Sequence, residues 1–162
     1  MIKSEHHGGL IIVLSFLVAM LLTAMPLPEW ASNWRPAWVA MVLFYWCMAL
    51  PNRIGIGVGW TMGLLLDVMQ GTLLGQNALG LAILAYFVIK SHQRIRMFPL
   101  LQQAFLVCFM VLIYLLLSLW VRGIMGVPPE SWTYWMPALT SMILWPWFFI
   151  ILRDIRRRYQ VY

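Results

Sequence analysis

Apolar residues fill the chain in six runs, separated by short polar, proline-containing or basic segments. A helix needs about 20 residues, with ~17–25 as the usual range, to cross a hydrocarbon core about 30 Å thick. The six runs approach or reach this length, and they cover residues 10–25, 36–50, 54–70, 73–89, 99–121 and 135–152. The pattern predicts an all-α, polytopic membrane bundle of six transmembrane helices, with residues 1–162 forming a single integral membrane domain.

Two alternatives to six retained spans remain open. Lys3 followed by an apolar run is also typical of a secretory signal peptide, but no A-x-A-like cleavage site follows this run. A protein with four spans would require the third and fourth runs to be re-entrant segments. In the second run, Pro36 is expected in the first helical turn, where the missing N–H of proline is tolerated.

The composition supports a membrane protein. Hydrophobic residues make up 63% of the chain and charged residues 10%, and the mean hydropathy is +0.83. In ordinary globular proteins, roughly 45–50% of the residues are apolar and about 25% are charged. Soluble nucleic-acid readers, disulfide-stapled secreted domains and cytosolic dinucleotide enzymes are therefore excluded, and no nucleic-acid partner is expected despite the net charge of +6.

The distribution of positive charge predicts the orientation of the spans. Lys and Arg collect in the cytoplasmic loops of membrane proteins. With both termini cytoplasmic, only Arg35 and Arg122 are external, and nine basic residues are internal: Lys3, Arg53, Lys90, Arg94, Arg96, Arg153, Arg156, Arg157 and Arg158. The sequence therefore predicts cytoplasmic N- and C-termini. The four arginines of the tail, Arg153, Arg156, Arg157 and Arg158, are expected to contact anionic lipids or a partner.

Asp67 is the only ionisable residue inside a predicted span, apart from tyrosine and cysteine side chains. An intramembrane aspartate protease would need a second carboxylate, and a serine protease of the membrane would need a histidine there. Cys47 and Cys108 lie in apolar runs and are interpreted as small core residues. The sequence therefore predicts no catalytic residues, no metal site and no cofactor.

Asp67 belongs to a row of small residues at four-residue intervals. Such spacing lets a second helix backbone approach closely. The row is a candidate for helix packing or for a partner interface, and it comprises Gly55, Gly59, Gly63, Asp67, Gly71 and Gly75. Asp67 is expected to face the interior of the bundle and to form hydrogen bonds with hydroxyls, amides or backbone N–H groups. The candidate partners are Tyr86, Tyr114 and a backbone N–H at a helix break near Gly71. If Asp67 has this structural role, the substitution Asp67→Asn is expected to be tolerated.

The order of these features resembles the rod shape-determining protein MreD family of bacterial inner membranes. The resemblance lies in six segments: Arg35-Pro36-Ala37-Trp38-Val39, Leu50-Pro51-Asn52-Arg53, Gly59 to Asp67, Gly71-Thr72-Leu73-Leu74-Gly75, Ala85-Tyr86 and Leu144-Trp145-Pro146-Trp147. Arg35, Pro36, Trp145 and Pro146 thus join the glycine row as candidates for helix packing or partner contact.

The resemblance implies a non-enzymatic, multi-pass scaffold of the cell-elongation machinery in the inner membrane. Its implied partners are an MreC-like bitopic protein, a RodA-type glycosyltransferase, a class B penicillin-binding transpeptidase and, indirectly, MreB filaments. Such proteins are expected to guide the synthesis of side-wall peptidoglycan and so to maintain rod shape.

The family is also similar to the substrate-binding subunits of energy-coupling-factor transporters, which are small six-helix bundles. This similarity gives an alternative function, a substrate-binding subunit for a vitamin-type solute. It predicts an external pocket, for which the candidates are Glu29, Asn33, Arg35, Gln76, Asn77, Arg122 and Glu130. Such subunits dock on their energising partner through small residues, typically alanines, at four-residue spacing on the first helix. Ser15, Ala19 and Thr23 match this motif only in part, because the alanine pair is missing. In a third, lipid-handling function, Arg35 and Arg122 would contact phosphate or carbohydrate-lipid headgroups.

Overall fold

The computed structural model describes residues 5–129 and 131–161, and within these ranges the chain is all-α, without strands. Lys3 and Glu130 lie outside the described residues. Six helices carry most of the chain: α1 (Glu5–Ala24), α3 (Trp38–Ala49), α4 (Ile56–Gln70), α5 (Gln76–Met97), α6 (Leu100–Ile124) and α7 (Met136–Arg158). A short helix α2 (Glu29–Ser32) and the 3₁₀ helix η1 (Trp132–Trp135) lie in the connections between them.

Each of the six apolar runs overlaps one of these helices, but several boundaries differ. Helix α5 continues beyond residue 89 through the basic segment to Met97, and α7 continues to Arg158. The placement of Pro36 in a first helical turn is wrong, because α3 begins at Trp38. Ala37 has a turn conformation, with φ −80° and ψ 73°, and its N–H donates to Ser141 Oγ of α7 at 3.0 Å. Contact with α7 therefore decides where α3 begins.

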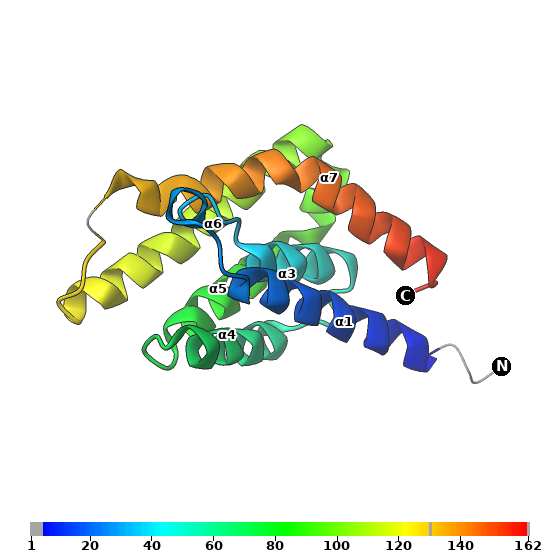
Figure 1. Ribbon diagram of the computed structural model, residues 1–162. Coiled ribbons are helices and arrows are strands. Elements are labelled where there is room, and N and C mark those ends of the chain that lie inside the picture. Colours follow the sequence, from blue (N-terminus) through cyan, green and yellow to red (C-terminus); the bar gives the residue numbers. More distant parts are fainter. Residues whose placement is uncertain (1–4, 130, 162) are drawn as a thin grey trace.

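Helix α3 forms the centre of the molecule (Figure 1). Every residue from Val39 to Ala49 is buried, and Trp46 is completely inaccessible. The helix packs against α1, α5 and α7. Its twelve residues correspond to a length of about 18 Å, which is less than the ~30 Å of a hydrocarbon core. Because α3 is too short to reach both faces of a hydrocarbon core, its ends lie within the protein. The free N–H and C=O groups at these ends need partners from the surrounding helices.

The most extensive helix contact joins α4 and α5, which run side by side (Figure 1). Gly63 makes this contact possible, since a Cβ atom at this position would lie 2.2 Å from Ala78 Cα. At Gly59 an added Cβ would lie 3.0 Å from the carbonyl oxygen of Leu81. These two members of the glycine row thus lie directly against the backbone of α5.

The outer helices expose large apolar side chains. Leu10, Val18 and Leu21 of α1 and Leu101 and Phe105 of α6 are each at least half exposed. Among the described residues, two helical stretches, Leu100–Ile124 and Trp132–Arg158, are long and apolar enough to cross a membrane. Three shorter apolar helical stretches cover Gly8–Ala24, Trp38–Ala49 and Ile56–Gln70. This apolar outer surface indicates a membrane protein.

The basic segments gather at one end of the molecule. The start of α1 and the end of α7 lie on the same side (Figure 1). At this end Arg96 of α5 donates to the carbonyl oxygens of Met48 and Ala49, at 2.8 and 2.6 Å, and so satisfies the C-terminus of α3. Arg35 and Arg122 lie at the opposite end, beside the start of α3. Among the described residues, Arg53, Arg96, Arg153 and Arg156 thus lie at one end of the molecule, and Arg35 and Arg122 at the other.

Candidate functional site

The carboxylate of Asp67 is buried, with 1% exposure, at the beginning of α5. Its Oδ1 accepts hydrogen bonds from Thr72 Oγ1 at 2.7 Å and from the backbone N–H of Asn77 at 2.9 Å. Its Oδ2 accepts from the N–H of Gly75 at 2.8 Å, with the N–H of Ala78 at 3.5 Å. The first N–H groups of a helix have no partner within the helix, and they carry partial positive charge. Asp67 of α4 therefore caps α5.

The turn between α4 and α5 brings this helix end to the carboxylate. Gly71 and Gly75 have positive φ values of +67° and +102°, which glycine adopts without steric cost. A Cβ atom added at either residue, or at Gly55 in front of α4, would meet no neighbour within 4 Å. The glycine row therefore serves two purposes, close packing at Gly59 and Gly63 and chain reversal at Gly71 and Gly75.

The hydrogen-bond network extends from Asp67 through Asn77 toward α6. Asn77 Nδ2 donates to Gln70 Oε1 at 3.1 Å, and Tyr114 Oη donates to Asn77 Oδ1. The ring of Tyr114 fits against Gly80, where an added Cβ would lie 2.5 Å from Tyr114 Cδ2. Tyr114 thus contacts Asp67 only through Asn77. Tyr86, the other tyrosine proposed as a partner of Asp67, is 46% exposed, so that proposal is wrong.

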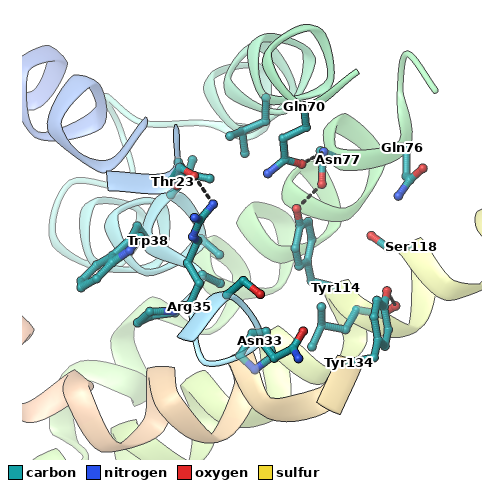
Figure 2. A pocket seen from close by; sticks show the side chains of 18 of the residues that line it. Thr23, Asn33, Arg35, Trp38, Gln70, Gln76, Asn77, Tyr114, Ser118 and Tyr134 are labelled. Atoms are coloured by element: carbon teal, nitrogen blue, oxygen red, sulfur yellow. Dashed lines mark hydrogen bonds between the residues drawn. The ribbon is translucent and has the colours of Figure 1, made fainter. Parts of the chain in front are cut away.

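A polar cavity of about 300 Å³ opens beside this network (Figure 2). Gln70, Gln76 and Asn77 lie on one side, and Tyr114, Ser118 and Tyr134 on another. The structure brings together five of the residues proposed for an external pocket: Asn33, Arg35, Gln76, Asn77 and Arg122. Glu29 is not among the residues that line the cavity. Among the described residues, no acidic candidate therefore contributes a carboxylate to the cavity that holds Arg35 and Arg122.

Arg35 reaches into this cavity from the segment before α3 (Figure 2). Its guanidinium donates to the carbonyl oxygens of Thr23 and Met25, at the end of α1. Its Nε atom is buried and has no hydrogen-bond partner among the residues that the structure describes. Arg35 thus satisfies the C-terminus of α1 and retains one unused donor in the cavity.

Arg122 enters the cavity from the last turn of α6. Its Cζ lies 5.5 Å from the ring centroid of Tyr134, a cation–π distance. Tyr134 Oη in turn donates to the carbonyl oxygen of Leu115 at 2.7 Å. Two cations, several amides and several hydroxyls therefore line one cavity, a combination that suits a small polar or anionic ligand.

Trp145 and Pro146 lie in the middle of α7. Trp145 is completely buried and packs edge-on against Phe44 of α3, with ring centroids 5.1 Å apart. Pro146 is half-buried inside the helix, and the cavity beside Asp67 is not lined by either residue. Pro36 lines that cavity next to Arg35. The tail arginines extend α7 at the other end of the bundle, and Arg153 and Arg156 are half-buried whereas Arg157 and Arg158 are exposed.

Sequence reasoning did not identify several polar residues that satisfy helix ends. Ser141 accepts from the N–H of Ala37, the residue before α3, Arg96 binds the carbonyls at the end of α3, and Gln103 Nε2 donates to the carbonyl oxygen of Ile95 at 3.0 Å. Their polarity within or beside apolar runs was the available signal, but their partners are 8 to 104 residues away. In the described residues, no group of His, Cys, Asp and Glu is arranged to hold a metal ion.

Comparison with known proteins gives a consistent assignment. Residues 4–155 match the family model described as rod shape-determining protein MreD. The chain is also 34% identical, over 147 residues, to the rod shape-determining protein MreD of Haemophilus influenzae, and the match covers 91% of both chains. No solved structure matches the chain. A family match over nearly the whole length, together with this identity, leads to one conclusion: the chain belongs to the rod shape-determining protein MreD family.

Proposed function

We propose that this protein is a non-enzymatic scaffold of the cell-elongation machinery in the bacterial inner membrane, where it helps to maintain rod shape. The observation that carries the proposal is the family match over residues 4–155. In this role the chain links an MreC-like bitopic protein to a RodA-type glycosyltransferase and a class B penicillin-binding transpeptidase. MreB filaments are coupled to the assembly indirectly.

The proposed topology has six transmembrane helices with cytoplasmic termini. It is supported by the gathering of basic residues at the end of the bundle that holds Arg53, Arg96 and Arg153. The short helix α3 is compatible with the bilayer because Arg96 satisfies carbonyl groups at its end and Ser141 pairs the N–H of Ala37 just before its start. Backbone groups without such partners would be costly in hydrocarbon.

An apolar groove on the outer surface is the proposed contact site for the membrane helix of the MreC-like protein. The groove, of about 490 Å³, lies between α1, α3 and α7, and its lining includes Leu14, Val18, Phe148 and Ile151. The small residues of α1 lie toward α3: Ala19 is 2% exposed, and Ser15 Oγ accepts from Trp46 Nε1 at 2.9 Å. Helix association in membranes relies on close van der Waals packing, for which a groove provides more contact than a flat face.

Two valines of α1 allow a matched test of this contact. Val13 and Val18 are both 54% exposed, but only Val18 lines the groove. Val18→Trp is expected to abolish capture of the MreC-like protein by a tagged copy from solubilised membranes, and to produce rounded cells. Val13→Trp is expected to retain both capture and rod shape at an equal protein level. Equal capture by the two variants would contradict the assignment of the groove.

The cavity beside Arg35 supports a second candidate function, that of a solute-binding subunit of a vitamin-type transporter. This function predicts an external pocket with convergent polar groups, and the cavity of about 300 Å³ has such a lining. The same capture experiment distinguishes the two functions. Recovery of the MreC-like protein and wall synthases supports the scaffold, whereas recovery of an ATPase pair and its coupling protein supports the transporter subunit.

A further inference from the structure

A second polar cavity, of about 380 Å³, lies at the other end of α3 from the cavity beside Asp67. It is formed where α3 and α5 end, where α6 begins and where the basic tail of α7 passes over them. Its polar lining consists of five side chains: Tyr45, Arg96, Gln103, Arg153 and Arg156. The volume corresponds to roughly a dozen water molecules, at ~30 Å³ each, which is enough for a small headgroup.

Positive charge predominates in this cavity. Arg96 contributes a guanidinium from α5, and Arg153 and Arg156 contribute two more from α7. The carboxylate of Asp154 lies 3.6 Å from Arg153 Nε, but its side chain is 65% exposed and does not line the cavity. Three cations facing one cavity suit an anion with several oxygen atoms, because guanidinium groups donate charge-assisted hydrogen bonds to phosphate.

Two buried side chains of the lining each have a polar atom without a hydrogen-bond partner among the described residues: Tyr45 Oη and Gln103 Oε1. Buried polar groups are normally paired, so an unpaired set in one cavity indicates a missing partner. Tyr45 and Gln103 are 1% and 3% exposed, respectively. Both side chains are therefore held within the protein while one atom of each remains available.

The unpaired atoms differ in what they can bind. Tyr45 O–H and the guanidinium N–H groups are donors, which suit phosphate oxygens. Gln103 Nε2 already donates to the carbonyl oxygens of Ile95 and Phe98, at 3.0 and 3.3 Å. Its Oε1 is consequently left as an acceptor, which suits a hydroxyl and not a phosphate oxygen. A ligand that satisfies both the donors and the Gln103 acceptor carries a phosphate with a neighbouring hydroxyl group.

We propose that this cavity binds the phosphoglycerol headgroup of an anionic phospholipid. Its arginines stand where the apolar part of α7 gives way to charged residues, which is the depth at which headgroups lie. Basic pockets between transmembrane helices on the cytoplasmic side are suited to anionic headgroups. The site goes beyond the scaffold function and does not depend on it, since lipid binding can be measured on the purified chain alone.

The tail of α7 supplies a matched control for the proposal. Arg153 and Arg156 are half-buried and line the cavity, and the Cζ of Arg156 lies 6.0 Å from the ring centroid of Tyr45. Arg157 and Arg158 are exposed and are not part of the lining. The double variants Arg153→Gln/Arg156→Gln and Arg157→Gln/Arg158→Gln therefore remove the same charge, from the cavity in one case and from the surface in the other.

The experiment is a lipid titration of the purified full chain in detergent, with retained lipid measured by native mass spectrometry. The probes are dioleoyl-phosphatidylglycerol, dioleoyl-phosphatidic acid, which lacks the headgroup hydroxyls, and sn-glycerol 3-phosphate, which lacks the acyl chains. The wild type and Arg157→Gln/Arg158→Gln are expected to bind phosphatidylglycerol equally and in preference to phosphatidic acid. Arg153→Gln/Arg156→Gln is expected to bind it at least about tenfold more weakly, because it removes two of the three guanidinium groups that face the cavity.

Equal weakening in the two double variants would overturn the site, because the tail would then act as undirected surface charge. Equal binding of phosphatidic acid would overturn the role of Gln103. Saturable binding of glycerol 3-phosphate at the same affinity would overturn the lipid as the source and indicate a free phosphate ester. If Arg153→Gln/Arg156→Gln does not accumulate, Tyr45→Phe provides the test, since it removes one donor and keeps the ring; wild-type affinity in that variant would count against the proposal.

Discussion

Asp67 of α4 accepts a hydrogen bond from the backbone N–H of Asn77, the second residue of α5, at 2.9 Å. The pair joins the end of one helix to the beginning of the next. A negative charge at a helix N-terminus is favourable because the N–H groups there carry partial positive charge. This relationship explains how an isolated carboxylate is accommodated in a predicted membrane span without a cationic partner.

Asp67→Asn is expected to destabilise the protein, in contrast to the expectation from the sequence. Both carboxylate oxygens accept hydrogen bonds, so the amide nitrogen of asparagine would face a donor, either Gly75 N–H or Asn77 N–H. An unsatisfied buried donor costs about 1–3 kcal/mol. The measurement is chemical unfolding in detergent, with Asp154→Asn as control because that side chain is 65% exposed. Wild-type stability of Asp67→Asn would show that the carboxylate does not cap α5.

Gly63→Ala is expected to separate α4 from α5. The new methyl group would lie 2.2 Å from Ala78 Cα, a backbone atom that cannot move independently of its helix. Overpacking of this kind costs typically about 1–3 kcal/mol. Gly57→Ala on the same helix is the control, because no atom lies within 4 Å of the added Cβ. Thermal unfolding should distinguish the two, and equal midpoints would refute the close contact.

Arg35→Gln is expected to loosen the end of α1. The substitution removes the guanidinium that binds the carbonyl oxygens of Thr23 and Met25. Hydrogen bonds to charged groups contribute about 1.5–3 kcal/mol, and partial exposure places this one near the lower limit. Arg122→Gln should cost no more than this, since Arg122 and Tyr134 are half-buried and a cation–π contact is worth about 0.5–2 kcal/mol between exposed and desolvated sites. Hydrogen exchange at residues 19–25 would locate the effect, and unchanged exchange in Arg35→Gln would contradict it.

The proposed topology predicts opposite labelling of two cysteine variants in intact cells. Gln93 lies in the basic end of α5 and Ser131 in the segment before η1, and both are exposed. A membrane-impermeant thiol reagent should label Ser131→Cys directly and Gln93→Cys only after permeabilisation. The wild type controls for the native cysteines, of which Cys47 is buried. The reverse pattern would place the termini outside.

The sequence was most informative where the determining contacts are local. The four-residue spacing from Gly55 to Gly75 and the single aspartate indicated that this segment packs closely and that Asp67 faces the protein. Thr72 and the N–H groups of Gly75 and Asn77, which bind the carboxylate, are five to ten residues away. The hydroxyl and N–H partners were therefore predictable as chemical types, whereas the two tyrosines proposed from depth were not partners.

The sequence was less informative about α3. Its apolar composition predicted a span, but not that this helix would be the buried centre of the bundle. Ser141 lies 104 residues from Ala37, and Arg96 lies 48 residues from Met48. Hydrophobic periodicity indicates which residues avoid water, and it does not distinguish burial in protein from contact with lipid. The place of α3 follows from which helices surround it.

The sequence by itself determined the helical class, the membrane character, the approximate helix ranges and the family, because these depend on composition, local pattern and similarity along the chain. Only the tertiary structure decided that Arg35, Asn77 and Arg122 share one cavity, that Arg96, Arg153 and Arg156 share another, and that Arg157 and Arg158 belong to neither. The physical reason is that a cavity forms where helix ends from distant parts of the chain meet. Its lining depends on how these helices pack, and the pattern within any one helix does not contain that information.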